Sequence, residues 1–330
     1  MRIALDAMGG DHAPEVAVDG GVRAAREYGY EVILVGKEAI VRNELTKHDA
    51  VGLSLPVVHA SEVLEMHEEP ARAARAKKDS SMAVAMRLVK EGRADAFASA
   101  GHSGGVMSTA LFVLGRIKGV KRPAGSSVFP SKTGQVFMLD LGMNTDCRPE
   151  WLLQFAIMGT IYAERVLGVE NPRLAIISNG EEEGKGSHLV KATVPLLKES
   201  GLNFVGNAEG KDIVSGMADV IVTDGFTGNV AVKTAEGVAE MLMGFLKSEI
   251  EKRPLAMLGA LLAKDAFRET KRRLDYTEYG GSPLLGVKGV VVIGHGRSNA
   301  KAIKNMVRLA AQCAERHMLE AIQESIEASL

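Results

Sequence analysis

Short apolar runs alternate along the chain with longer segments in which apolar side chains recur every three or four positions. The apolar runs fall at residues 3–5, 31–35, 56–59, 94–98, 135–139, 173–177, 219–223 and 287–293. A strand followed by a helix, repeated from end to end, is typical of parallel βαβ units. We therefore expect an α/β fold in three layers, with a mostly parallel sheet between two layers of helices.

Proline and serine mark where several of these helices begin. Pro14 and Pro149 stand at first-turn positions, where a missing N–H is tolerated, and Ser80 precedes a helical pattern as an N-cap. A long helix is predicted after residue 229, broken at Pro254. The length predicts two lobes, but no boundary between them is visible, so residues 1–330 are treated as a single unit.

Glycine is concentrated at the joints between strands and helices. The chain has 36 glycines in 330 residues, about 11% against a usual ~7%. Loops rich in Gly, Asp and Asn follow most of the strands, at residues 6–12, 99–105, 140–147, 178–187, 224–229 and 294–299. If these loops share the carboxyl edge of one parallel sheet, their backbone N–H groups and helix ends form a site for an anionic ligand.

Two well-known nucleotide motifs are absent. The segment from Gly180 to Ser187 resembles a P-loop, but only three residues separate Gly180 from Gly184, and Gly186 follows Lys185 where Ser or Thr is required. No loop has the G-x-G-x-x-G spacing of a dinucleotide-binding strand–helix turn.

Composition narrows the class of protein further. With 40 basic and 41 acidic residues the net charge is -1, which argues against nucleic-acid binding. Two cysteines are too few for a disulfide framework, and neither a secretory signal nor a transmembrane stretch is evident, so we expect a cytoplasmic location. Cys147 lies in a strand-to-helix loop. Two roles are open for it, a thiol nucleophile and a small packed residue.

Five motifs together resemble one known family. They are Asp6–Pro14 (DAMGGDHAP), Ser99–Gly101 (SAG), Gly180–Gly186 (GEEEGKG), Asp219–Asn229 (DVIVTDGFTGN) and Tyr279–Gly286 (YGGSPLLG). The chain is similar over almost its whole length to the PlsX family, the phosphate acyltransferases of bacterial phospholipid synthesis. The resemblance implies transfer of a long-chain acyl group from acyl carrier protein to inorganic phosphate. It also implies an isocitrate and isopropylmalate dehydrogenase-like fold, a homodimer, no metal or other cofactor, and a glycerol-3-phosphate acyltransferase as the downstream partner.

The reaction suggests roles for the loop residues. Phosphate is already largely dianionic near neutral pH and a thiol is a competent leaving group, so the protein needs donors for the phosphate and the oxyanion, with no Ser-His-Asp triad. The predicted catalytic residues are Lys185, Asp224, Asn229, Lys233 and Asn144, with both asparagines as donors. The predicted phosphate- or substrate-binding residues are Asp6, Gly9, Gly10, Asp11, His12, Ser99, Gly101, His102, Gly184, Gly186, Gly225, Thr227 and Gly228. The aspartates are expected to orient other groups, because extra carboxylates facing phosphate would weaken binding.

Residues 250–273 form a separate feature, an apolar segment inside a basic collar. Its apolar residues follow helical spacing after Pro254, and its cations flank them. We predict contact through Leu255, Leu258, Leu261, Leu262, Lys264, Arg268 and Arg272. This pattern suits an anionic membrane surface, which would make the protein peripheral to the inner face of the membrane, and it suits an acidic carrier protein. The alternative is burial of the tip in a dimer interface.

Three other functions remain open from the sequence. A phosphotransacetylase-like enzyme would use acyl-CoA instead of a carrier protein. A non-enzymatic membrane-associated scaffold would bind phosphorylated ligands without turnover. A metal-dependent dehydrogenase on the same fold would change nicotinamide absorbance.

Overall fold

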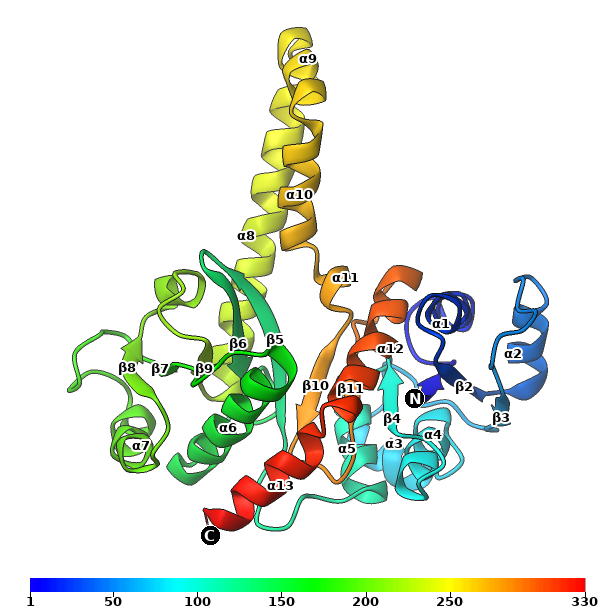
Figure 1. Cartoon of the computed structure of the whole chain (residues 1–330), viewed down its shortest axis with the longest axis horizontal. Coiled ribbons are helices and arrows are strands. Elements are labelled where there is room, and N and C mark those ends of the chain that lie inside the picture. The colour runs from blue at the N-terminus through cyan, green and yellow to red at the C-terminus, as the bar shows by residue number, and fades with distance from the viewer. Residues whose placement is uncertain (330) are drawn as a thin grey trace.

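One open 11-stranded sheet runs through the molecule, and helices cover both of its faces (Figure 1). The computed structural model describes residues 1–329, apart from the side chains of Lys271, Leu274 and Tyr276. Across the sheet the strand order is β3-β2-β1-β4-β11-β10-β5-β6-β9-β7-β8. The three-layer α/β arrangement predicted from the sequence is confirmed.

The strands are β1 (Arg2–Asp6), β2 (Glu31–Gly36), β3 (Val57–His59), β4 (Ala96–Ser99), β5 (Ala124–Ser131), β6 (Gly134–Leu139), β7 (Leu174–Ile177), β8 (Phe204–Ala208), β9 (Val220–Val222), β10 (Ser282–Leu285) and β11 (Val291–Ile293). The helices are α1 (Glu15–Tyr28), α2 (Glu38–Leu45), α3 (Pro70–Ala76), α4 (Ser81–Lys90), α5 (Ser103–Val113), α6 (Pro149–Tyr162), α7 (His188–Glu199), α8 (Gly225–Glu251), α9 (Pro254–Leu262), α10 (Lys264–Leu274), α11 (Tyr276–Tyr279), α12 (Ala300–Glu315) and α13 (Met318–Ala328). A π-helical turn (Ala163–Leu167) extends α6, and a 3-10 turn (Gly210–Val214) follows β8.

The sheet has two parallel halves that run in opposite directions. Strands β3, β2, β1, β4 and β11 form the first half, and β6, β9, β7 and β8 form the second. Between them β10 pairs antiparallel with both β11 and β5, and β5 pairs antiparallel with β6. The expectation of one shared carboxyl edge is therefore wrong, and each half brings its own cluster of loops.

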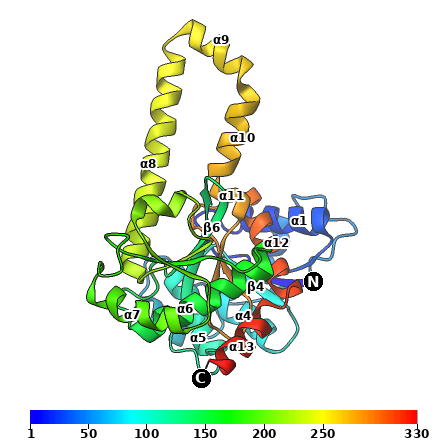
Figure 2. The same cartoon turned by 60° about the vertical axis from the view of Figure 1, so that its left-hand side comes forward.

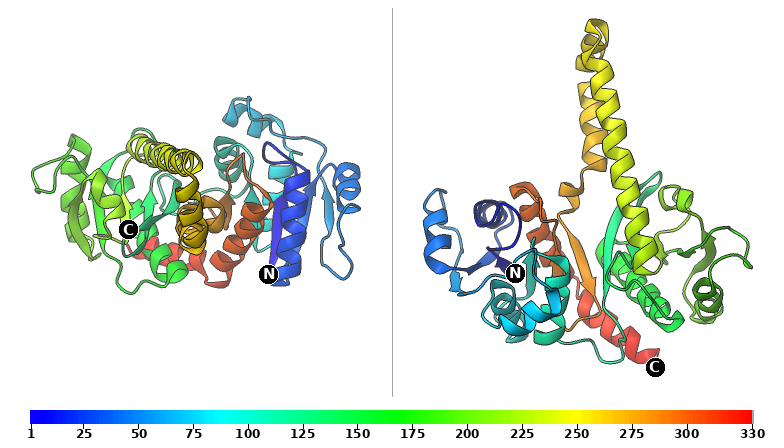
Figure 3. Two further views of the ribbon diagram at one scale, coloured as in Figure 1. Left: turned by 90° about the horizontal axis from the view of Figure 1, so that it is seen from above. Right: turned by 180° about the vertical axis from the view of Figure 1, so that it is seen from behind.

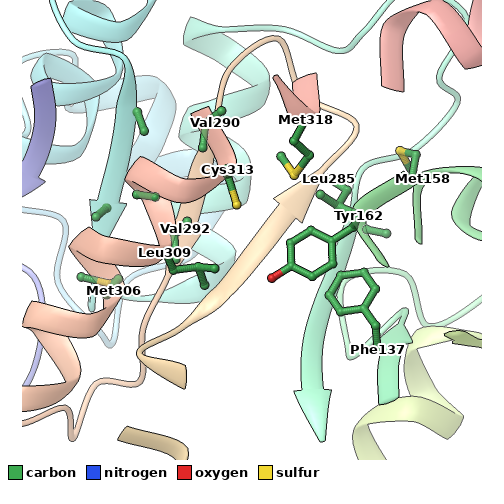
Figure 4. Close-up of a cluster of buried hydrophobic side chains, with 14 of the residues drawn as sticks. Phe137, Met158, Tyr162, Leu285, Val290, Val292, Met306, Leu309, Cys313 and Met318 are labelled. Atoms are coloured by element: carbon green, nitrogen blue, oxygen red, sulfur yellow. The ribbon is translucent and has the colours of Figure 1, made fainter. Parts of the chain in front are cut away.

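A continuous apolar core joins the two halves. Phe137 on β6 stacks on Tyr162 of α6 with ring centroids 4.0 Å apart. Figure 4 shows this pair beside Leu285 and Met318, with Met306 and Cys313 of α12 on the far side. All six side chains are buried in the same cluster. The halves are consequently held as one packed unit beneath the loops.

Helices α8, α9 and α10 project from this unit as a tower, with α9 at its tip (Figures 1 and 2). Helix α8 has 27 residues, which corresponds to roughly 40 Å. Figure 3 shows the tower leaving the sheet region from above and from behind. No residue of α9 is buried. The break predicted at Pro254 is confirmed, since α9 begins there.

Among the described residues, no helix is both long and apolar enough to cross a membrane.

Candidate active site

The first loop cluster is organised by a buried aspartate at the end of β1. The Asp6 carboxylate accepts hydrogen bonds from Ser99 Oγ (2.7 Å) and from the Met8 N–H (3.1 Å). Ser99 Oγ in turn accepts from the Gly101 N–H at 3.0 Å. Burial raises the pKa of Asp6 above its usual value, while the hydrogen bonds from the Ser99 hydroxyl and the Met8 N–H act to lower it. Asp6 thus ties the loops after β1 and β4 together.

Glycine lets these loops approach each other closely. A Cβ on Gly9 would lie 2.5 Å from the Asp6 carboxylate and 2.7 Å from Ser99 Oγ. Gly10 has φ +112°, and the next residue, Asp11, donates its N–H to the Gly296 carbonyl at 2.8 Å. Three loops, after β1, β4 and β11, therefore meet here, as a Gly-rich site requires.

Helix α5 opens beside this cluster with free donors. His102 caps it, because its Nδ1 accepts from the Gly105 N–H at 3.1 Å. The N–H groups of Ser103 and Gly104 have no hydrogen-bond acceptor in the part of the chain that the structure describes. Such helix-opening N–H groups favour an anion. His12 lies exposed at the start of α1, where its carbonyl accepts from the Val16 N–H at 3.1 Å.

The second loop cluster is organised in the same way by Asp140, at the end of β6. Its carboxylate is fully buried and accepts five hydrogen bonds. The donors are the N–H groups of Gly125 (2.9 Å), Leu141 (2.7 Å), Met143 (3.3 Å) and Asn144 (2.6 Å) and the Asn144 side-chain amide (2.8 Å). Burial raises the pKa of Asp140, and the donated hydrogen bonds oppose that rise. Asp140 is therefore a positioning residue.

The predicted role of Asn144 as a substrate donor is corrected by the structure. Its Nδ2 donates to Asp140 Oδ2 and to the Pro123 carbonyl, both at 2.8 Å. Two hydrogens are available on that nitrogen, and both are used. Asn144 is only 8% exposed and fixes the loop against the start of α8.

Helix α8 begins inside this second cluster. Asp224 caps it by accepting from the Thr227 N–H and from Thr227 Oγ1, both at 2.8 Å. The Gly225 N–H donates to the Asn144 carbonyl at 2.7 Å. The Phe226 N–H has no acceptor among the described residues, which leaves it as the free donor of the first turn. A Cβ on Gly228 would lie 2.0 Å from the Asp140 carbonyl oxygen, so only glycine allows this packing.

Asn229 and Lys233 follow on the same helix. Asn229 is exposed, and its Cβ lies 3.5 Å from the place that a Cβ on Gly142 would take. Lys233 pairs with Glu236 at 2.8 Å. Glu236 also faces His295 of the first half at 3.8 Å, and burial lowers the pKa of that imidazole. Helix α8 thereby links the two loop clusters.

Lys185 lies on a third loop, between β7 and α7. Its side chain is exposed and its N–H donates to the Glu182 carbonyl at 2.9 Å. Gly184 is exposed, and the Gly186 N–H donates to Asn179 Oδ1 at 2.8 Å. β7 is the neighbour of β9, so this loop and the start of α8 follow adjacent parallel strands. The structure records no hydrogen bond or ion pair from the Lys185 side chain within the described chain.

Three carboxylates near that loop could hold a cation in principle. Glu181, Glu209 and Asp212 offer oxygens within 4.8 Å of one another. Lys211 lies among them, 3.0 Å from Glu181 and 2.6 Å from Glu209. Its ammonium group pairs with two of the three carboxylates, so the cluster is an ion-pair network.

Cys147 is a packed residue in this site. Its Sγ lies 3.4 Å from the Asn144 carbonyl, and burial raises its pKa to about 12. The raised pKa favours the packed residue over the activated nucleophile, because the thiolate is the reactive form.

Sequence reasoning missed the roles of Asp140 and of the Phe226 N–H. A signal for Asp140 was present, since Leu-Asp stands at the end of β1 and at the junction after β6, and a glycine loop follows in both places. The Phe226 N–H carries no signal in the sequence, because a free backbone donor depends on what its neighbours use.

Comparison with known proteins places the chain in a family. The family model described as "Fatty acid synthesis protein" matches residues 1–321. The phosphate acyltransferase of Geotalea daltonii is 51% identical over 329 residues, covering 98% of this chain and 95% of that protein. The phosphate acyltransferase of Dictyoglomus turgidum is 50% identical over 329 residues, covering 99% and 98%. The chain belongs to the phosphate acyltransferase family. As a member of this family it is a transferase of lipid biosynthesis.

Solved structures show the fold of this family member. A phosphotransacetylase from Streptococcus pyogenes superposes with a TM-score of 0.65 at 18% identity, covering 96% of this chain and 94% of that one. The EutD phosphotransacetylase from Staphylococcus aureus gives 0.63 at 16% identity, covering 95% and 94%. This chain therefore shares the phosphotransacetylase fold.

Proposed function

We propose that the chain transfers a long-chain acyl group from the thioester of acyl carrier protein to inorganic phosphate, giving acyl phosphate. One observation carries the proposal. The buried or capping carboxylates Asp6, Asp140 and Asp224 are all engaged as hydrogen-bond acceptors of the loops. These three carboxylates therefore position the loops instead of acting as bases, which fits a nucleophile that is already anionic.

The chemistry needs little more than those donors. A phosphate oxygen attacks the thioester carbonyl carbon, the C–O bond forms, and negative charge develops on the carbonyl oxygen. The C–S bond then breaks, and the carrier thiolate leaves and takes up a proton from water. Preformed N–H groups stabilise the oxyanion, and a closed site excludes water as a competing nucleophile.

The described residues divide these tasks. The free N–H groups of Phe226, Ser103 and Gly104 are donors at helix ends, where a negative charge is favoured. Lys185 and Lys233 supply positive charge, and Asn229 supplies a side-chain amide at the start of α8. Asp140 and Asn144 hold the loop against which α8 begins.

The test is steady-state kinetics with long-chain acyl carrier protein and phosphate. We expect Lys185→Ala to raise the KM for phosphate about tenfold or more, because a hydrogen bond to a charged group is lost. Asp224→Ala is expected to lower kcat by loosening the first turn of α8. Kinetics like the wild type in both variants would contradict the assignment of the site.

Two measurements separate this proposal from its rivals. Acyl phosphate trapped by hydroxylamine, with phosphate-dependent release of carrier thiol, distinguishes an enzyme from a scaffold that only binds. Comparing acyl carrier protein with acyl-CoA of the same chain length distinguishes the carrier-dependent enzyme from a phosphotransacetylase-like enzyme. A clear preference for acyl-CoA would overturn the carrier-protein donor.

The exposed side chains of the tower support the proposal that this reaction takes place at a membrane surface. The apolar residues at the tip are strongly exposed, with Leu255 at 85% and Leu262 at 84%. The collar residues Arg268 and Arg272 form only exposed ion pairs, with Asp265 and Glu269, which leaves them available to anionic headgroups. Peripheral attachment to the inner face of the membrane, a homodimer, and delivery of acyl phosphate to a glycerol-3-phosphate acyltransferase complete the proposal.

A further inference from the structure

A compact group of exposed cations lies beside the second loop cluster, away from the tower. It consists of Arg116, Lys118, Lys121, Arg122, Arg148 and Lys288, here called the basic patch. None of the six forms an ion pair with a described residue. Asp146 and Glu150 are the acidic residues on the neighbouring segment. The patch therefore carries an uncompensated positive charge in a chain whose net charge is -1.

The backbone beneath the patch is held in one conformation. Buried Gln154 donates to the Gly119 carbonyl at 3.0 Å and accepts from the Lys121 N–H at 2.8 Å. The Arg116 guanidinium donates to the Lys121 carbonyl, and the Lys288 N–H donates to the Gly115 carbonyl at 2.9 Å. Preorganisation of this kind reduces the entropy that a docking surface loses on binding.

An aromatic ring anchors two of the cations. The guanidinium of Arg122 lies 5.1 Å from the centroid of the Trp151 ring, and that of Arg148 lies 5.8 Å from it. Cation–π contacts hold both guanidinium groups at the surface while leaving their N–H groups free for carboxylates. Trp and Arg are also the residues that most often dominate protein–protein interfaces.

The patch is joined directly to the active site. Pro123, next to Arg122, accepts the Asn144 amide at 2.8 Å, and the Gly125 N–H donates to Asp140 at 2.9 Å. Arg148 follows Asn144 by four residues, at most roughly 13 Å of extended chain. In Figure 1 the loop that connects α5 to β5 runs along the lower edge, at the opposite end of the molecule from α9.

We infer that the basic patch is the docking surface for the acidic acyl carrier protein that donates the acyl group. The inference rests on the proposed function and adds where the donor binds. Charge complementarity selects an acidic partner, and the distance to Asn144 places the carrier's flexible thioester arm within reach of the loops. No large apolar side chain within the patch is strongly exposed in the described chain, so the patch lacks the inserting residues that a lipid surface requires.

The test combines binding and kinetics on Lys118→Glu/Lys121→Glu, since neither lysine side chain holds the fold. The matched control is Lys37→Glu/Arg165→Glu, which makes the same charge change at exposed cations elsewhere. For the patch variant we expect the Kd of holo acyl carrier protein, measured by fluorescence anisotropy, to rise about tenfold or more. The KM of this variant for the long-chain acyl carrier thioester should rise similarly, while kcat stays unchanged. Its KM for S-acyl pantetheine, a small acyl donor without the carrier protein, should also stay unchanged. Wild-type binding should weaken with added salt more steeply than that of the variant.

The outcomes are distinguishable. Equal Kd values for wild type and patch variant, or an equal loss in the control, would overturn the docking surface. A patch variant that instead keeps carrier binding and loses binding to anionic vesicles would assign the basic patch to a membrane surface. That result would also overturn the docking surface for the carrier. If the patch binds the carrier but the wild type makes no acyl phosphate, the proposed function fails while the docking surface stands.

Discussion

At the scale of single residues, the two loop clusters depend on buried carboxylates that hold backbone. Asp140 is the clearer case, because all five of its hydrogen bonds come from the loop and from Gly125. In Asp140→Asn one oxygen becomes an NH₂ group, and either orientation of the amide points that group at N–H donors. We expect the free energy of unfolding to fall by about 1–3 kcal/mol, with a loss of kcat, measured by urea denaturation and steady-state kinetics.

A matched control for this variant is Asp146→Asn, on the same segment but exposed. It should change stability by less than about 0.5 kcal/mol, as surface substitutions usually do. If Asp140→Asn were as stable and active as Asp146→Asn, the positioning role of Asp140 would be wrong.

Cys147 gives a prediction that depends on pH. Its pKa of about 12 lies above that of a free thiol, ~8.5, because burial disfavours the thiolate. The thiolate therefore becomes abundant only as the pH approaches 12, and at pH 8 we expect iodoacetamide to modify Cys147 about a thousandfold more slowly than a free thiol. Cys147→Ala should retain turnover within about twofold. Inactivation in that variant, or alkylation that rises with an apparent pKa below 9, would restore the nucleophile hypothesis.

At the scale of elements, the start of α8 carries the second cluster. Gly228→Ala would force a Cβ to 2.0 Å from the Asp140 carbonyl oxygen, so helix and loop must separate. We expect a loss of at least about 2 kcal/mol in unfolding free energy and a large loss of activity. Gly237→Ala is the control in the same helix, since nothing lies within 4 Å of the added Cβ. It should be neutral or stabilise by up to about 1 kcal/mol. Similar effects in both variants would contradict the packing described.

Elements whose sequence patterns were regular were predictable, and those that reverse the sheet were not. The helix N-cap at Ser80 is confirmed, because Ser80 Oγ accepts from the Ala83 N–H at 3.3 Å. Strands β5, β8 and β10 were missed. Strands β5 and β10 each contain a proline, Pro130 and Pro283, which argues against a strand. These two strands create the antiparallel centre, so the sequence could not show that the loops form two clusters. The linking contact between Glu236 and His295 was unpredictable for the same reason.

At the scale of the whole molecule, the tower exposes a row of apolar side chains along α8. Helix α8 exposes Val238, Met241, Leu242, Phe245 and Leu246, at 43–63%. Their spacing puts them on one face of the helix, and Figure 2 shows α8 and α10 well apart. A row of exposed apolar side chains of this length marks an interaction surface. The proposed homodimer covers it with the same helix of a second copy.

This arrangement predicts the oligomeric state. Leu242→Asp/Phe245→Asp would place two charges in the proposed interface, at a cost that well-packed apolar surface cannot offset. We expect a monomer in light scattering after size exclusion, with wild type a dimer at the same concentration. Lys247→Asp, at an exposed position on the opposite face of α8, should leave the dimer intact. A dimer in all three proteins would move the interface elsewhere.

The tip makes the remaining prediction, on membrane contact. Leu258 is 57% exposed at the centre of α9, and burying such side chains in the headgroup region contributes roughly 1.5–3 kcal/mol each. Leu258→Glu should therefore abolish flotation with vesicles containing anionic lipid. Val51→Glu makes the same charge change at an apolar residue that is 92% exposed and lies outside the tower, and it should float like wild type. Vesicles of zwitterionic lipid should recover less wild-type protein, because the cations flanking the tip need an anionic surface. Equal flotation of Leu258→Glu and wild type would show that the tip does not insert, and burial against a second copy would then remain as its role.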